Sequence, residues 1–158
     1  RALVDMRALD SLEARHLITM HFYDLIGLTL GATRDAADIA QGRGLAAARL
    51  RAIKSDILAH LEWPELNVSS VAKRHGVTPR YVQRLFEPEG ITFSEFVRDQ
   101  RLARAYRMLG DPRHAALAVS TIAYDTGFGD LSYFNRAFQR LYGMSPSDVR
   151  AVARKKPM

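Results

Sequence analysis

The sequence predicts an all-α protein, and three observations support that prediction. No stretch of the 158 residues sustains the alternation of apolar and polar side chains that marks a half-buried strand. Apolar residues recur instead at helical spacing, as Leu50, Ile53, Ile57 and Leu61 do. The C-terminal part also repeats a pattern of helix, glycine turn and helix. We therefore expect two helix-turn-helix subdomains, joined by a linker helix and preceded by an N-terminal helical segment.

The composition narrows the class of protein. Hydrophobic residues make up 47% and charged residues 25%, as in an ordinary globular domain of this length. The chain has no cysteine, which excludes disulfides, thiolate metal sites and cysteine nucleophiles. The longest apolar stretch, 17–30, contains His21 and Asp24 and is too short to span a bilayer. We expect a cytoplasmic protein with no membrane partner, and a fragment of a longer chain, because it begins with Arg1.

The charge is concentrated in the C-terminal part. Residues 1–66 hold 8 Lys/Arg and 9 Asp/Glu, a net charge of −1, whereas residues 67–158 hold 15 and 8, a net charge of +7. A basic module beside a neutral one favours a polyanionic partner, most often nucleic acid. Because many basic domains bind nothing specific, the charge alone leaves both interpretations open.

The N-terminal part is expected to hold two helices. The first covers about Ser11 to Leu30 and ends at Gly31. The small and polar segment 31–44 is typical of a linker. The second helix covers about Leu45 to Glu62 and ends before Pro64, which forces its neighbour out of the helical conformation.

Residues 67–158 contain two copies of one unit. The offset between corresponding residues is 51 at the turn glycine, 52 at the tyrosine that follows and 53 at the last glycine, so two single-residue insertions account for the drift. The corresponding pairs are Val68 and Val119, Ala72 and Ala123, Gly76 and Gly127, Tyr81 and Tyr133, Arg84 and Arg136, Phe86 and Phe138, and Gly90 and Gly143. The repeat predicts helix-turn-helix units at about 67–87 and 118–142.

Local signals define the turns within each unit. Asn67 and Thr78 are expected to cap the two helices of the first unit, and Asp130 the second helix of the second unit. Gly76 and Gly127 can adopt the left-handed conformation that ends the preceding helix. A helix-turn-helix places its second helix in the major groove of DNA.

The second helix of each unit has one apolar and one polar face. Val82, Leu85 and Phe86 are expected to be buried in the first unit, and Phe134, Ala137, Phe138 and Leu141 in the second. The outward residues are Arg80, Gln83 and Arg84 in the first unit and Leu131, Ser132, Asn135 and Arg136 in the second. Gln or Asn can bind adenine, and Arg can bind guanine. One such pair is more often a solvated surface, but two pairs at equivalent positions favour base contacts.

A linker helix over about Phe93 to Leu109 connects the two units, and Thr92 with Glu95 forms its capping box. About 17 residues span ~25 Å, and one helix diameter adds ~10 Å, so the recognition helices are expected to lie about 35 Å apart. That separation is about one turn of B-DNA. The arginines of this helix are spaced three apart, and salt bridging is favoured over phosphate contact for them. They are Arg98, Arg101, Arg104 and Arg107.

At this point the sequence resembles the DNA-binding domain of AraC/XylS-family transcription regulators. Residues 122–150, IAYDTGFGDLSYFNRAFQRLYGMSPSDVR, look like the signature of that family, and residues 77–86, VTPRYVQRLF, look like its first recognition helix. The resemblance covers about 45–154 and implies double-stranded DNA as the partner. It implies base contacts by residues on both recognition helices, namely Arg80, Gln83, Arg84, Leu131, Ser132, Asn135 and Arg136.

Two residues depart from the pattern of that family. Ala118 stands where the family has a capping Ser or Asp, so the first helix of the second unit is expected to lack a side-chain cap. Pro88 is expected to shorten the first recognition helix. Leu131 is apolar and is expected to make only van der Waals contact, for example with a thymine methyl group.

The resemblance also carries expectations for residues 1–44, which look like the helices that lead from a sensor domain into such a DNA-binding domain. A β-rich sensor is expected upstream of this chain. Helices of this kind often dimerise, and the first helix is apolar over more than half its circumference, so we expect a homodimer through it. Activation of transcription is the working expectation, with RNA polymerase as a candidate partner.

Two rival classes of protein remain for comparison. An enzyme is not expected, because His16 and His21 are too far apart for a metal-binding pair on one helix face and no phosphate loop or nucleophile elbow is present. We predict no catalytic residue, no metal and no cofactor. A helical protein-interaction module without specific DNA binding explains the apolar first helix. It does not explain the repeat, the basic half or the outward amide and arginine pairs.

Overall fold

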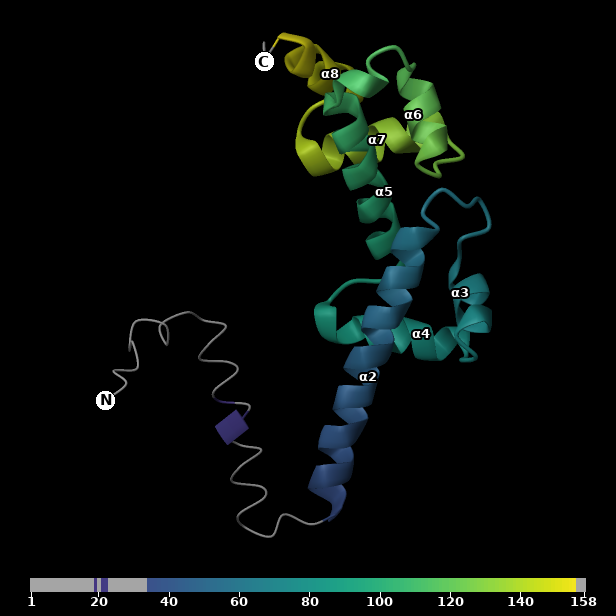
Figure 1. Cartoon of the computed structure of the whole chain (residues 1–158), viewed down its shortest axis with the longest axis vertical. Coiled ribbons are helices and arrows are strands. Elements are labelled where there is room, and N and C mark those ends of the chain that lie inside the picture. The colour runs from purple at the N-terminus through teal and green to yellow at the C-terminus, as the bar shows by residue number, and fades with distance from the viewer. Residues whose placement is uncertain (1–18, 20, 23–33, 156–158) are drawn as a thin grey trace, which may run out of the picture. The chain divides into compact units, whose positions relative to one another are not determined.

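The computed structural model describes the backbone of residues 19, 21–22 and 34–155, and the side chains of all of these except 34–41 and 155. Every helix or strand assignment in that part of the chain is helical (Figure 1), which confirms the all-α prediction. The α-helices are α2 (Arg34–Ala59), α3 (Val68–Arg74), α4 (Pro79–Phe86), α5 (Phe93–Gly110), α6 (Val119–Asp125), α7 (Leu131–Tyr142) and α8 (Pro146–Lys155). None of the described helices has the length and apolar character needed to cross a bilayer.

The chain divides into two compact units, residues 1–48 and 49–158, and α3 to α8 all belong to the second. Most of the first helix predicted from the sequence, 11–30, lies outside the described residues. Within that range only Thr19, His21 and Phe22 are described, and they are helical.

The predicted linker over 31–44 is wrong from Arg34 onward, because α2 begins there and runs without a break to Ala59. Alanine has the highest helix propensity, and this segment is rich in alanine and has no proline. Gly42 and Gly44 each cost about 1 kcal/mol in a helix, which the neighbouring residues offset. The helix also ends at Ala59, three residues before the predicted Glu62. Its predicted apolar stripe is buried at Ile53, Ile57 and Leu61 and half-buried at Leu50.

The turns of the two helix-turn-helix units have the same backbone geometry. Gly76 and Gly127 both have positive φ, 63° and 94°. The next residue in each turn donates its N–H to a carbonyl five residues earlier, at 3.0 Å for Val77 to Ala72 and 3.0 Å for Phe128 to Ala123. This bond closes the C-terminal motif in which a glycine satisfies the last carbonyls of a helix. The predicted turn glycines are therefore confirmed in both copies.

The predicted helix caps of the first unit are also present. The Asn67 side-chain oxygen accepts bonds from the N–H groups of Ser69 and Ser70, each at 2.9 Å, and the Thr78 hydroxyl accepts one from Tyr81 at 3.2 Å. Each such cap satisfies N–H groups that have no partner within the helix.

Pro88 shortens the first recognition helix, as predicted. Helix α4 ends at Phe86 after 8 residues, and a 3₁₀ turn, η2 (Glu87–Glu89), follows up to Gly90. The corresponding helix α7 has no such proline and runs for 12 residues. Proline lacks the N–H that the next helical turn needs, and its ring clashes with the carbonyl four residues earlier.

Helix α5 packs against both helix-turn-helix units. Near its N-terminus, Phe93 meets Phe86 of α4 edge-on, with ring centroids 6.0 Å apart. Further along, Leu102, Ala105 and Leu109 join a buried cluster with residues of α6, α7 and α8. The capping box predicted at Thr92 and Glu95 is present at the start of this helix. Because one continuous helix contributes to both cores, the two helix-turn-helix units share a scaffold.

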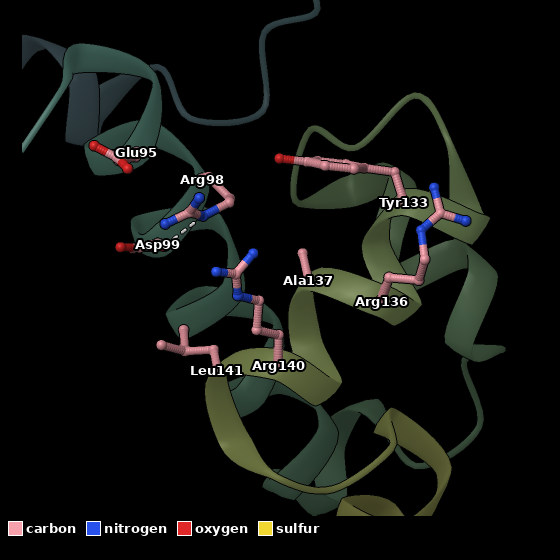
Figure 2. A pocket seen from close by; sticks show the side chains of 8 residues that line it. All are labelled: Glu95, Arg98, Asp99, Tyr133, Arg136, Ala137, Arg140 and Leu141. Atoms are coloured by element: carbon pink, nitrogen blue, oxygen red, sulfur yellow. Dashed lines mark hydrogen bonds and ion pairs between the residues drawn. The ribbon is translucent and has the colours of Figure 1, made fainter.

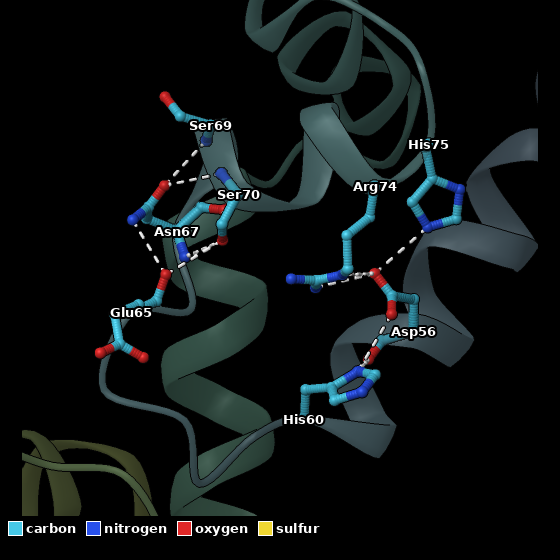
Figure 3. Close-up of polar contacts among 8 residues, drawn as sticks. All are labelled: Asp56, His60, Glu65, Asn67, Ser69, Ser70, Arg74 and His75. Atoms are coloured by element: carbon cyan, nitrogen blue, oxygen red, sulfur yellow. Dashed lines mark hydrogen bonds and ion pairs between the residues drawn. The ribbon is translucent and has the colours of Figure 1, made fainter.

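A polar cluster joins the C-terminal part of α2 to the end of α3 (Figure 3). The Asp56 carboxylate accepts hydrogen bonds from Arg74 at 2.8 Å and lies 3.2 Å from His75 and 3.0 Å from His60. Burial of Asp56 opposes its ionisation, but the hydrogen bonds to Arg74 and His75 outweigh burial and lower the pKa of the carboxyl group. The cluster therefore fixes the first unit on the scaffold through a charged carboxylate.

Ala118 precedes α6 in an extended conformation, with φ −65° and ψ 152°, and offers no side-chain cap. We expect Ala118→Ser to raise the free energy of unfolding by about 0.5–2 kcal/mol, because a serine hydroxyl would bond a free N–H of the first turn. Urea unfolding of the variant measures the gain. Ala116→Ser, at an exposed position in the preceding loop, is the matched control. Equal midpoints for the two variants would show that the N–H groups of α6 are already satisfied.

Candidate nucleic-acid interface

Helix α4 presents three polar side chains to solvent. Its other face is apolar, and Val82 and Phe86 are completely buried in the core. Arg80, Gln83 and Arg84 are all exposed. The burial of one face thus leaves the predicted base-reading residues on the free face of a helix that is capped and fixed at its start. Their contact with bases remains a prediction.

An aromatic ring holds Arg84 in place. The Arg84 guanidinium lies 5.4 Å from the centroid of the Tyr81 ring, and the Arg49 guanidinium lies 5.7 Å from it. Cation–π attraction of this kind restricts the rotamers of an arginine that would otherwise be free in water. Arg49 was not predicted from the sequence, because it lies on α2, more than 30 positions from Tyr81, and no local pattern connects the two residues.

Helix α7 presents the second set of polar residues. Asp130 caps it by accepting a bond from the Tyr133 N–H at 2.7 Å, and Phe134 and Phe138 are completely buried. Ser132, Asn135 and Arg136 are exposed. This set is the repeat-related counterpart of the residues on α4.

The burial predicted from the sequence is wrong for two leucines of α7. Leu131 was expected to point outward, but it is half-buried and packs against the core of the second unit. Leu141 was expected to be buried, but it is 47% exposed. Tyr142 takes the inward place instead, with its ring 4.8 Å from Phe138 and 4.6 Å from Tyr106. A residue four positions after Phe138 lies on the same helix face, and here it excludes the residue three positions after.

A cleft of about 610 Å³ opens between α5 and α7 and is lined by arginines from both helices (Figure 2). Arg98 comes from α5, and Arg136 and Arg140 come from α7. Arg98 is bonded to Asp99 at 2.7 Å, and this hydrogen bond raises the pKa of Arg98. Arg140 was missed in the sequence, although its spacing of four from Arg136 places both on one helix face. Glu95 and Asp99 of α5 also line the cleft, so its cationic side is the one formed by α7.

The other arginines of α5 mostly bind the protein itself. Arg104 pairs with Glu62 at 2.7 Å, and Arg101 donates hydrogen bonds to the carbonyls of Leu61 and Trp63. These contacts, with the Arg98 to Asp99 pair, support the structural role that the sequence favoured for the linker arginines. The cations of the candidate interface therefore come chiefly from α4 and α7.

Comparison with known proteins places this arrangement in context. A protein-family model described as a helix-turn-helix domain matches the sequence of residues 71–151. The transcriptional activator RhrA of Rhizobium meliloti is 36% identical over 144 residues, which cover 91% of this chain and 44% of RhrA. The arabinose operon regulatory protein of Escherichia coli is 31% identical over 109 residues, which cover 68% of this chain and 36% of that protein. The chain thus spans less than half the length of these curated relatives.

Solved structures share the same fold. The C-terminal domain of AraT, a response regulator from Geobacillus stearothermophilus, matches with a TM-score of 0.59 and 28% identity over 65% of this chain and 84% of that domain. A transcriptional regulator with an AraC-type DNA-binding domain from Chromobacterium violaceum matches with a TM-score of 0.62 and 23% identity, covering 72% of this chain and 99% of that one.

Proposed function

Because the chain belongs to the AraC-type family of helix-turn-helix transcription regulators, we propose that it reads two successive major grooves of duplex DNA. One observation carries this proposal. The two recognition helices expose an amide followed by an arginine at equivalent positions, Gln83 and Arg84 on α4 and Asn135 and Arg136 on α7. Arginine bonds guanine O6 and N7, and glutamine or asparagine bonds adenine N6 and N7.

The length of the linker helix supports a separation of about one turn of B-DNA between the two recognition helices. Helix α5 has 18 residues and is therefore about 27 Å long. With the width of one helix added, the two recognition helices can enter grooves about 34–36 Å apart on one face of the duplex. Arg49 and Arg140 are exposed cations outside the predicted set of base-reading residues, and we assign them to the phosphates that fix the register.

Selection of bound duplexes from a random pool tests the proposed function. We expect enrichment of a site with two conserved blocks whose centres lie about 10 base pairs apart, since each recognition helix reads its own groove. The same selection with the Arg84→Ala/Arg136→Ala double variant is the matched control and should lose both blocks. Enrichment of a single block, or of none, would contradict reading by both helices.

The regulatory role belongs to the longer protein. We propose activation of transcription in the cytoplasm, with RNA polymerase as partner, because RhrA, which aligns with 91% of this chain, is called a transcriptional activator. Transcription in vitro from a promoter that carries the selected site should rise when the chain is added. A fall would assign repression instead.

We also propose that the chain is a homodimer through residues 11–30. The sequence of this segment has more large apolar residues than one neighbouring helix can cover, and each that is buried contributes about 1.5–3 kcal/mol. Leu25→Lys should convert a dimer at about micromolar concentration into a monomer in sedimentation, with the far-UV helix signal of 49–158 retained. Thr29→Lys adds the same charge at a polar position and should leave the dimer intact. A monomeric unmodified chain would overturn this proposal.

A further inference from the structure

Gly127 lies in the tightest backbone contact found around any described glycine. A Cβ atom built on it would lie 2.4 Å from the Leu61 carbonyl oxygen and 2.7 Å from Nε of Arg101. Gly76, its counterpart in the first copy of the repeat, has open space at the same position. Gly127 is therefore needed for a second reason besides its positive φ: a side chain there would collide with Leu61 and Arg101. The equivalent turn of the first unit has no such neighbour. Gly127 leaves room for the chain segment that leads into the first unit.

Arg101 fills the junction between that segment and the linker helix. Its Nε donates to the Leu61 carbonyl at 2.8 Å, and a terminal nitrogen donates to the Trp63 carbonyl at 3.0 Å. Both acceptors are backbone carbonyls, and burial lowers the pKa of the Arg101 guanidinium. One turn further along α5, Arg104 pairs with Glu62 at 2.7 Å. Residues 61–63 are thus attached to α5 by three polar contacts from two arginines.

Arg101 also borders an open groove that lies between the two helix-turn-helix units. Its volume is about 520 Å³, and its lining includes Leu66 and Val68 from the first unit and Phe128 and Tyr133 from the second. Without Arg101, the approach of the two units would depend on α5 and on the few apolar side chains along this groove. The guanidinium therefore supplies directional contacts at a point where packing is incomplete.

We propose that Arg101 is a positioning residue that holds residues 61–63 against the Gly127 turn and thereby sets the angle between the two recognition helices. This inference rests on the proposed function, because the angle matters only if both helices read one duplex. A protein with two DNA-binding helices gains affinity from the second helix only when the connection between the helices matches the spacing of the two DNA sites. A rigid junction thus makes the chain selective for one spacing of the two DNA blocks.

Spacing selectivity is the first measurement. One base pair inserted between the two blocks moves the second by ~3.4 Å and turns it by ~35° about the DNA axis. We expect the ratio of affinities for the correct and the inserted spacing to fall by about tenfold in Arg101→Met, because a looser junction tolerates the wrong spacing. Arg107→Met, at an exposed arginine of the same helix, should leave the ratio unchanged. Affinity for a duplex with a single block should be equal in all three proteins, and an unchanged ratio under that condition would overturn the proposal.

Distance measurement tests the junction without DNA. The chain has no cysteine, so Glu87→Cys and Gln139→Cys introduce two unique spin-label positions, both exposed, beside α4 and on α7. We expect a narrow distribution of label distances in the otherwise unmodified chain and a broader one after Arg101→Met. Equal widths would overturn the role of Arg101 even if DNA binding itself failed. If Arg101→Met does not fold, Arg101→Lys is measured instead, because it keeps the charge but replaces the two-armed guanidinium with a single donor nitrogen. We expect a broader distribution than in the parent; a width equal to that of the parent would count against the proposal.

Discussion

Binding of this chain to duplex DNA is expected to weaken about a thousandfold between roughly 50 and 200 mM salt. A protein that neutralises about six phosphates releases their counterions, which gives a slope near −5 when log K is plotted against log salt concentration. Residues 67–158 carry a net charge of +7, and the exposed arginines of α4 and α7 place several of these charges on the proposed DNA-binding surface. Fluorescence anisotropy titrations at a series of salt concentrations measure the slope.

Two single variants make this expectation specific. Arg140→Gln removes a cation from the cleft beside α7 and should reduce the slope by about one, as expected for a single phosphate contact. Arg113→Gln removes an exposed arginine outside both recognition helices and should leave the slope unchanged. An affinity for DNA that stays constant over this range of salt would rule out the proposed interface.

Arg84→Ala and Arg136→Ala are each expected to weaken binding to the selected site by about 1–3 kcal/mol, while binding to random duplex barely changes. The loss comes from the two hydrogen bonds that a guanidinium makes with one guanine. For Arg84 the nearby Tyr81 ring restricts the guanidinium before DNA arrives, so little conformational entropy is lost on binding.

The positions of the affected bases give a second measurement for these variants. Substituting each base pair of the selected site should locate the lost contacts of Arg84 and of Arg136 in different blocks, about one helical turn apart. Arg113→Ala serves as the control for removal of a surface arginine. Equal losses on specific and random DNA would assign both arginines to phosphate contact or to folding.

The parts of the fold that the sequence predicted depend on short-range interactions. The caps at Asn67, Thr78 and Asp130 act on N–H groups two or three residues away, and Pro88 ends α4 through its own ring. Each of these signals is complete within one helical turn, so it can be identified without knowledge of the rest of the chain. The repeat doubled the number of such signals and thereby indicated which helix of each unit is the candidate recognition helix.

The predictions that were wrong concern positions where local signals favoured two structures about equally. The small and polar composition of 31–44 suggested a linker, but the alanines in and after this segment have enough helix propensity to continue α2 from Arg34. Leu141 and Tyr142 both follow Phe138 at helical spacing, and spacing alone cannot decide which one is buried. Tyr106 of α5 decides it, because its ring packs against that of Tyr142, with centroids 4.6 Å apart.

The sequence by itself thus determined the helices of the two helix-turn-helix units and the linker helix between them, the caps at Asn67, Thr78, Thr92 and Asp130, the two turns and most of the polar face of each recognition helix. Only the tertiary structure brought Arg101 to the carbonyls of Leu61 and Trp63, about 40 positions away, and placed Gly127 against the same segment. It also placed Arg49 beside the Tyr81 ring. Contacts of this kind depend on how whole helices pack, and packing is determined by the shape of the complete core rather than by any local run of residues.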